Sequence, residues 1–230
     1  MTKQVLSQAA AEFDRWAEVG RAESMERGHR PATEAATSHW SLTSSDVVLD
    51  VGCGNGWALR MLLEQGAGRG VGIDVSPGMI ARARTMSTAD RTRFEVAPAA
   101  QLPLEDAEVS HVLSVEALYY TPDPAQTLTE WARVTRSGGQ LVIMIDLFAE
   151  NPVGQVWIDV LDVDAHLLSI PQLIEMAEAA GWTDLQTSRY RDQGPPKTEV
   201  EFEPSRYWPS YEVYLGYLEA GSLMLRATRA

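Results

Sequence analysis

Aspartates and glycines near the start of the chain have the types and spacing of a ligand-binding loop. The segment VVLDVGCGNG closes an apolar run with Asp50 and then places glycine at every second position, at Gly52, Gly54 and Gly56. Glycine permits backbone conformations and close approaches that a side chain would block. Asp74 ends a second apolar run about 20 residues later, and a carboxylate at that distance suits the two hydroxyls of a ribose. The pattern predicts a nucleoside site.

The glycine spacing separates this loop from other nucleotide-binding loops. The dinucleotide fingerprint is G-x-G-x-x-G, whereas here the order is G-C-G-N-G, so the third glycine comes one residue early. No G-K-[ST] follows, which excludes the loop of nucleoside triphosphatases. An NAD(P)-dependent oxidoreductase on a Rossmann sheet stays open as an alternative, as does a non-catalytic binding protein.

Strands and helices must carry these residues to one edge of a sheet. Short runs rich in β-branched residues alternate with segments of helical periodicity. We expect strands over 47–51, 70–75, 93–98, 108–115 and 139–146, with helices over 57–65, 76–86 and 124–135 between them. Such alternation is typical of βαβ units and predicts an α/β, Rossmann-like, doubly wound sheet with helices on both faces. Its ligands bind beyond the carboxyl ends of the strands.

The segments before and after this core are expected to complete a single domain over residues 1–230. Helical spacing predicts a helix over 4–19 and a second from Pro31 to Trp40, with the proline in its first turn. After Asp146 we expect a short helix, a helix ending at Gly181, a strand, a further helix and a last strand. These terminal strands form an antiparallel C-terminal edge. We therefore divide the chain into an N-terminal helical lid over 1–45, a ligand-binding core over 46–146 and a C-terminal half over 147–230.

The composition limits the partners and the location of the protein. The formal net charge of −13 repels phosphate backbones, so nucleic acid is not an expected partner. No apolar run approaches the roughly 20 residues of a membrane span, and the N-terminus lacks the apolar region of a signal peptide. With a single cysteine, these features predict a cytoplasmic protein. No metal ion is predicted, and both a monomer and a homodimer are open.

Four motifs resemble those of the class I S-adenosylmethionine-dependent methyltransferases. They occur in the family's order along residues 46–146 as VLDVGCGNG, GVGIDVSPGMIARAR, QLPLED and VSHVLSVEALYYTPDPAQTLTEWARVTRSGGQLVIM. The nearest resemblance is to the small-molecule type that includes the ubiquinone and menaquinone C-methyltransferases. It implies S-adenosylmethionine as cofactor and transfer of its sulfonium methyl group to a small-molecule acceptor by SN2 displacement. The accepting atom is not implied.

The resemblance also implies a cofactor-binding set, which runs along the chain as Asp50, Gly52, Cys53, Gly54, Gly56, Asp74, Val75, Met79, Ala99, Gln101, Ser114 and Val115. Asp74 would hold the ribose hydroxyls. Val75 and Met79 would pack on the adenine. Ser114 and Val115 would border the methionine part and the transferred methyl.

One loop departs from the family pattern. After their third strand, relatives often read G-D-A-x-x-L-P, with the acid bonded to the adenine amino group. Here the loop reads APAAQLP, and Pro98 stands where the acid is expected. The backbone N–H of Ala99 and the side chain of Gln101 are the groups left to read the adenine edge.

Candidate acceptor-binding residues lie outside the cofactor motifs, and no catalytic residue is assigned. We take them to be Trp16, His29, Tyr119 and Tyr120. Trp16 and the two tyrosines equally suit plain packing. The charged segment 18–31 either folds over the cofactor or is an exposed helix end and linker. Its candidate lid residues, besides His29, are Arg21, Glu23, Met25 and Glu26.

Overall fold

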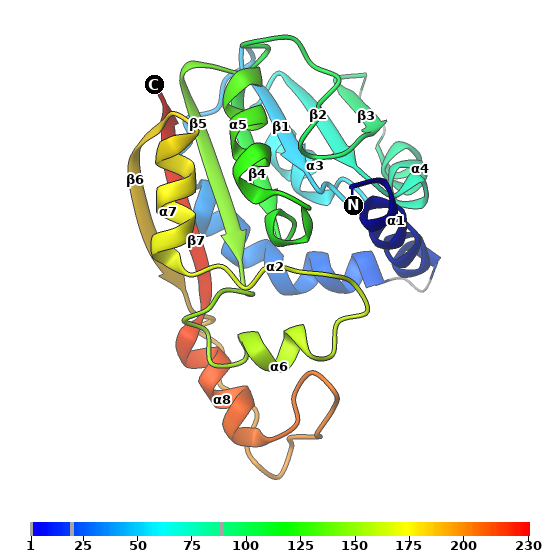
Figure 1. Cartoon of the computed structure of the whole chain (residues 1–230), viewed down its shortest axis with the longest axis vertical. Helices are drawn as coiled ribbons and strands as arrows, with labels where there is room; N and C mark the ends of the chain where they lie inside the picture. Colours follow the sequence, from blue (N-terminus) through cyan, green and yellow to red (C-terminus); the bar gives the residue numbers. More distant parts are fainter. Residues whose placement is uncertain (1, 19–20, 88–89) are drawn as a thin grey trace.

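A seven-stranded sheet forms the centre of the protein in the computed structural model, which describes residues 2–18, 21–87 and 90–230. Its strands are β1 (Val47–Val51), β2 (Arg69–Asp74), β3 (Thr92–Val96), β4 (Val109–Val115), β5 (Thr135–Ile145), β6 (Trp182–Tyr190) and β7 (Ser222–Arg229). They lie in the order β3-β2-β1-β4-β5-β7-β6, and β7 runs antiparallel to both neighbours. The predicted fold class is confirmed. The antiparallel strand β7 lies one place inside the edge, which β6 forms (Figure 1).

The helices cover both faces of this sheet. They are α1 (Thr2–Glu18), α2 (Arg21–Thr37), α3 (Trp57–Glu64), α4 (Pro77–Met86), α5 (Pro124–Val134), α6 (Gly154–Ile158), α7 (Ile170–Ala179) and α8 (Tyr211–Ala220), with a 3-10 turn η1 (Leu118–Tyr120). Trp131 of α5 and Leu173 of α7 pack in the core on one face. Ala36 of α2, Leu59 of α3 and Ile80 of α4 pack in the core on the other. Burial of these apolar faces drives the layered arrangement.

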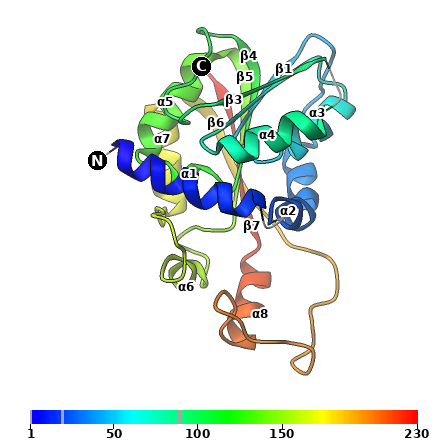
Figure 2. The ribbon, with the colours of Figure 1, turned by 90° about the vertical axis from the view of Figure 1, so that its right-hand side faces the viewer.

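The order of the strands creates the crevice in which a ligand can bind. β1 pairs with β2 on one side and with β4 on the other, so the chain reverses its direction of travel across the sheet between β1 and β4. Loops that follow such strands diverge to opposite faces and leave a crevice at the carboxyl ends. Helix α1 packs against α4 at this end of the sheet (Figure 2).

Two expected element boundaries are wrong. The helix expected from Pro31 to Trp40 begins at Arg21, so Pro31 lies inside α2. Ion pairs from Arg30 to Glu26 and Glu34 bridge successive turns around the proline, and tertiary packing holds the helix on both sides of it. Strand β5 begins at Thr135 rather than at residue 139.

The irregular start of β5 explains that second difference. The register between β4 and β5 shifts from Val109 opposite Thr135 to His111 opposite Gln140. Gly138 adopts a φ of 73° in the extra residues. The Ser-Gly-Gly segment therefore bulges within the strand instead of preceding it.

An aromatic cluster stabilises the segments beyond the sheet. Helices α6 and α8 lie past the carboxyl end of β5 (Figure 1). The ring of Trp157 from α6 lies 5.3 Å from Trp208 and 5.5 Å from Tyr217 of α8.

Within the described residues, no helix combines the length and apolar character needed to cross a bilayer.

Candidate cofactor and acceptor pocket

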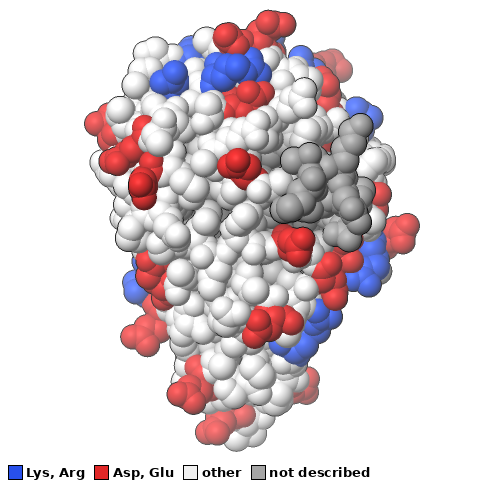
Figure 3. All heavy atoms as spheres, viewed as in Figure 1, with Lys and Arg blue, Asp and Glu red and all other residues white. Residues whose placement is uncertain are grey.

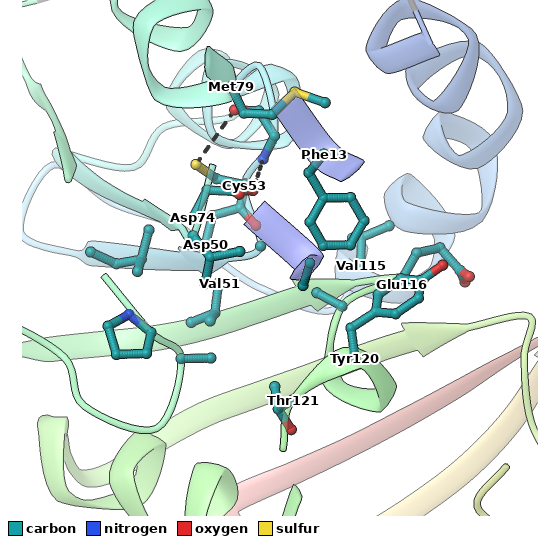
Figure 4. A pocket seen from close by; sticks show the side chains of 18 of the residues that line it. Phe13, Asp50, Val51, Cys53, Asp74, Met79, Val115, Glu116, Tyr120 and Thr121 are labelled. Atoms are coloured by element: carbon teal, nitrogen blue, oxygen red, sulfur yellow. Dashed lines mark hydrogen bonds between the residues drawn. The ribbon is translucent and has the colours of Figure 1, made fainter. Parts of the chain in front are cut away.

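A pocket of about 360 Å³ opens at the carboxyl ends of β1, β2 and β4, under α1 and α2. Most of the predicted cofactor-binding residues line it, namely Asp50, Gly52, Cys53, Gly54, Asp74, Val75, Met79, Ala99, Gln101 and Val115. Figure 4 shows Asp50, Cys53, Asp74 and Met79 gathered at one side of the space. Phe13, Glu116 and Tyr120 lie at the other side. We call these two sides the cofactor end and the acceptor end.

The glycine loop is held by the end of β2 and by its neighbours. The backbone N–H groups of Gly52 and Cys53 both donate to the Ile73 carbonyl, at 2.8 and 3.0 Å. Gly52, Gly54 and Gly56 all have positive φ angles, 77°, 52° and 76°. A Cβ on Gly52 would lie 2.2 Å from the Cβ of Ala117. These contacts explain why the chain needs glycine to make this turn.

The glycines of the loop have different surroundings. A Cβ on Gly56 would lie 2.8 Å from the ring of Phe94, so this glycine permits tight core packing. A Cβ on Gly54 would meet no protein atom within 4 Å, and Gly54 lines the pocket. Gly54 therefore leaves its backbone open to a ligand. Gly56, although predicted as a cofactor-binding residue, does not line the pocket.

Asp74 ties the loop to the next helix. Its Oδ2 accepts a hydrogen bond from the Gly54 N–H and its Oδ1 accepts one from the Ser76 N–H, both at 2.9 Å. Ser76 itself caps α4, because its Oγ accepts from the Met79 N–H at 2.9 Å. Burial raises the pKa of Asp74, although these backbone donors partly oppose the rise. The carboxylate keeps further lone pairs and is placed at the pocket wall, as ribose binding requires.

Asp50 is a buried carboxyl group without a neutralising partner. It is 2% exposed, and its Oδ2 has no hydrogen-bond partner among the described residues. Burial, and then the charge of Asp74, raise the pKa of Asp50 to about 7. A cation bound at this end would remove that penalty. The amino group and sulfonium of S-adenosylmethionine are such cations, so the residues present fit this cofactor.

The adenine side differs from the pattern usual in the family. Pro98, Ala99 and Gln101 line the pocket, as expected for the loop after β3. The Ala99 carbonyl accepts a hydrogen bond from the Trp131 indole at 3.1 Å, which fixes this loop on α5. The Gln101 side chain is exposed at the rim. How the adenine edge is read stays a prediction.

Helices α1 and α2 supply the apolar wall of the acceptor end. The ring of Phe13 lies 5.2 Å from that of Trp16, in an edge-to-face contact. It lies 5.2 Å from the ring of Tyr120 in a second such contact (Figure 4). Asp14 anchors α1 on α4, where its Oδ1 accepts from the Gly78 N–H at 2.8 Å. Three of the predicted acceptor residues, Trp16, His29 and Tyr120, line the pocket.

A cluster of ionisable groups, which we call the His29 cluster, lies at this end and consists of His29, Glu116 and Asp146 with Tyr119 and Tyr217. His29 Nε2 lies 3.5 Å from Asp146 Oδ2. Tyr217 donates to the same Oδ2 at 2.7 Å, and Tyr119 donates to Glu116 Oε2 at 2.6 Å. The Asp146 N–H donates to Glu116 Oε1 at 2.6 Å. Glu116 adopts a φ of 53°, a conformation rarely found outside glycine and often associated with function.

Burial and mutual charge shift the pKa values in this cluster. Burial and the neighbouring Asp146 raise the pKa of Glu116 to about 8. For His29, burial alone would lower the pKa, but hydrogen bonding to Asp146 and the charge of Glu116 raise it to about 9. The hydrogen bond and charge of His29 hold the pKa of Asp146 below its ordinary value despite burial. Without another cation, His29 and Asp146 therefore form a buried ion pair.

Several predicted residues lie elsewhere. Ser114 is fully buried on β4 and does not line the pocket, and neither does Tyr119, which hydrogen-bonds Glu116. Alternate residues of β4 face opposite sides of the sheet, so Val115 lines the pocket and Ser114 does not. The contacts of Ser114 and Tyr119 with the methyl or the acceptor stay predictions.

Of the candidate lid residues, some line the pocket and others form ion pairs away from it. Met25 lines the pocket with His29, whereas Glu23 pairs with Arg82 of α4 and Glu26 pairs with Arg30. The side chain of Arg21 lies outside the described part of the structure. Only one turn of the segment therefore reaches the pocket in the described residues.

Sequence reasoning missed Phe13, Glu116, Asp146 and Tyr217 as site residues. Glu116 directly follows the predicted Val115, so an acid at the carboxyl end of β4 was the available signal. Phe13 was visible only as one apolar position of a helix. No local pattern relates Asp146 to Tyr217, which are far apart in the chain. Described residues after Trp131 do not line the pocket, so the C-terminal half reaches the acceptor end from behind it.

Comparisons with known proteins agree with this geometry. A family model described as a methyltransferase domain matches residues 49–143. A solved chain from Haloferax volcanii, assigned as a methyltransferase and determined in complex with the Trm112 methyltransferase activator, is 32% identical. Its TM-score is 0.87, and the match covers 94% of this chain and 97% of that one.

Curated proteins match over shorter stretches. The 27-O-demethylrifamycin SV methyltransferase of Amycolatopsis mediterranei is 36% identical over 49% of this chain and 43% of its own length. The 2-methyl-6-phytyl-1,4-hydroquinone methyltransferase of Synechocystis is 34% identical over 64% of this chain and 50% of its own length. The matches thus span half or less of these curated relatives. With the order of the strands, the glycine loop and the near full-length match, they show that the chain belongs to the class I S-adenosylmethionine-dependent methyltransferases.

Proposed function

We propose that the protein transfers a methyl group from S-adenosylmethionine to a small-molecule acceptor held between α1, α2 and the end of β4. The observation that carries this proposal is the continuity of the pocket. Asp50, Gly54 and Asp74 line it at the cofactor end, and His29 and Glu116 line it at the acceptor end. A cofactor and an acceptor can therefore meet within one pocket.

When bound, S-adenosylmethionine supplies a methyl group that its positive sulfur already activates for displacement. Asp74 would hold the ribose, and Asp50 would face the positive groups of the methionine part. The protein's own contribution is position and exclusion of water, which Phe13, Trp16 and Tyr120 provide at the acceptor end. Glu116 is the side chain that can accept a proton where the acceptor binds.

The acceptor is best described as flat and oxygen-bearing. Three aromatic side chains line the acceptor end, and aromatic faces favour a planar ligand. Two of the curated relatives are, by name, a 27-O-demethylrifamycin SV methyltransferase and a 2-methyl-6-phytyl-1,4-hydroquinone methyltransferase. Charge argues against nucleic acid, since acidic side chains are scattered among few basic ones on the face shown in Figure 3. A cytoplasmic location is supported only by the single cysteine.

An acceptor screen tests this function. The purified chain is incubated with S-adenosylmethionine and a panel of phenols, hydroquinones, thiols and amines, and S-adenosylhomocysteine is quantified. The screen is run with and without the Haloferax volcanii Trm112 activator, because the relative of known structure was solved in that complex. We expect turnover with a phenol or hydroquinone, lost in Asp74→Asn. Binding of S-adenosylmethionine without turnover of any acceptor in either condition would instead support a non-catalytic binding protein.

A further inference from the structure

We propose that His29, Glu116 and Asp146 bind one divalent transition-metal ion at the acceptor end of the pocket. His29 comes from α2, Glu116 follows β4 and Asp146 follows β5, so three separate segments meet here. One ligand atom from each residue, an imidazole nitrogen or a carboxylate oxygen, lies within 4.8 Å of the others. That spacing is what a single ion with bonds of about 2.0–2.2 Å can bridge after small movements.

An unsatisfied oxygen within this group points to a missing ligand. Asp146 is 3% exposed, and its Oδ1 has no partner with hydrogen-bond geometry among the described residues, although the Ser222 hydroxyl also contributes to lowering the pKa of this carboxyl group. Its other oxygen already receives the Tyr217 hydroxyl. Leaving a buried carboxylate oxygen without a partner is costly, and a metal ion would satisfy it directly.

The atoms around the three residues are arranged as they are around metal ligands. His29 Nδ1 lies 2.9 Å from the Met25 carbonyl. When Nδ1–H donates to that carbonyl, Nε2 keeps its lone pair and faces Asp146. Each carboxylate also receives a tyrosine hydroxyl, Tyr119 on Glu116 and Tyr217 on Asp146. Metal-bound histidines and carboxylates are usually oriented by such outer hydrogen bonds.

The ligand set indicates the kind of ion. One imidazole and two carboxylates suit Mn²⁺, Fe²⁺, Co²⁺ or Zn²⁺ better than a soft ion that prefers sulfur. Two carboxylate charges balance the ion while His29 is neutral. His29 and Glu116 both line the pocket, so the open coordination positions would face it. An oxygen of the acceptor could then complete the coordination, a step that rests on the proposed methyltransferase function.

Metal binding can be tested apart from catalysis. The chelator-treated protein is titrated with Mn²⁺, and free Mn²⁺ is followed by electron paramagnetic resonance, with Zn²⁺ as competitor. We expect one Mn²⁺ per chain, displaced by Zn²⁺. Asp146→Asn and His29→Gln should each weaken binding at least tenfold. Asp162→Asn, which removes an exposed acid near Arg15 and Arg206, is the matched control and should bind normally.

Folding and cofactor binding are checked on the same samples. Calorimetry with S-adenosylhomocysteine should give the same affinity for the wild type, both ligand variants and the control, since their substitutions lie away from Asp50 and Asp74. A variant that binds S-adenosylhomocysteine normally but loses Mn²⁺ supports the site. If the wild type holds no Mn²⁺, or if the ligand variants hold it as well as Asp162→Asn does, the cluster is only a buried ion pair. Failure of the acceptor screen would leave this metal result unaffected.

Discussion

The cofactor end and the acceptor end of the pocket share one space but are built by different means. At the cofactor end, backbone groups between β1 and β2 define the shape, and Asp74 bonds the loop through Gly54 and Ser76. At the acceptor end, side chains from α1, α2, β4, β5 and α8 meet. A short contiguous segment can therefore encode the first end, whereas the second depends on how distant elements pack.

Their electrostatics also differ. Burial and the charge of Asp74 raise the pKa of Asp50 at the cofactor end to about 7. Asp146 at the acceptor end faces His29, and its pKa is lowered. The carboxyl group at the cofactor end would therefore be neutralised by the positive groups of S-adenosylmethionine. The carboxylate at the acceptor end already has His29 as its ionic partner.

The largest expected effect separates the two ends by cofactor affinity. Asp74→Asn replaces the carboxylate that we propose to accept the ribose hydroxyls and that accepts the loop N–H groups. Hydrogen bonds to charged groups contribute about 1.5–3 kcal/mol. We expect the affinity for S-adenosylhomocysteine, measured by calorimetry, to fall about 10- to 150-fold. Glu116→Gln should change it less than about twofold. An unchanged affinity in folded Asp74→Asn would show that the ribose is not held there.

Asp184→Asn is the control for that measurement. Asp184 is exposed on β6, has a φ of 52°, and is replaced by a residue that tolerates this conformation. Any loss of affinity in this variant would reveal a general effect of removing an acidic charge.

The next effect separates two glycines of the same loop. Gly54→Ala places a methyl group in the pocket and strains a positive φ at a cost of about 1–2 kcal/mol. Gly56→Ala causes similar backbone strain and also brings its methyl group into close contact with Phe94. Such overpacking typically costs about 1–3 kcal/mol more. We expect Gly54→Ala to lose at least tenfold in cofactor affinity with the smaller drop in melting temperature. Normal cofactor binding by folded Gly54→Ala would show that this glycine only permits the turn and does not contact the cofactor.

The smallest expected effect is on how the melting temperature changes with pH, which should have opposite signs for variants at the two ends. The folded-state pKa of Asp50 is raised from 3.8 to about 7, so the folded protein loses stability as pH rises through that interval. Asp50→Asn removes this loss. Its melting temperature relative to the wild type should increase between about pH 5 and pH 8, by about 2–4 °C for each kcal/mol.

Asp146→Asn should behave in the opposite way. The pKa of Asp146 is lowered in the folded state, so its carboxylate contributes stability above 3.8, the ordinary value. The raised pKa of His29, about 9, keeps the pair charged across the same range. Melting scans of chelator-treated, ligand-free protein should therefore show Asp146→Asn below the wild type from about pH 5 to pH 8. Equal curves for the two variants would mean that the ends do not differ in this respect.

The cofactor end could be predicted because its determinants are local. Gly52, Gly54 and Asp74 lie within a single βαβ unit, in which alternating apolar runs specify the strands and place the loop at their carboxyl ends. Ser76 and the following proline likewise marked the start of α4. The sequence did not indicate which residues of β4 face the pocket, and the structure buries Ser114 away from the pocket lining.

The acceptor end could not be predicted in the same way. His29 lies in α2 before Pro31, a residue that normally starts helices or interrupts them. The sequence therefore predicted a helix that begins only at Pro31 and leaves His29 outside it. Glu116 and Asp146 were neighbours of predicted strands, but nothing in their spacing related them to each other or to Tyr217.

By itself, the sequence determined the order of strands and helices, the glycine loop, the aspartate at the end of β2 and the family, since each depends on residues close in the chain. Only the tertiary structure decided that His29 of α2 would face Asp146 after β5, and that Tyr217 of α8 would bond the same carboxylate. The physical reason is that burial, more than spacing, makes these charges interact. Far apart in an unfolded chain they are solvated and independent, whereas packing of α2 and α8 at the end of the sheet removes water and couples them.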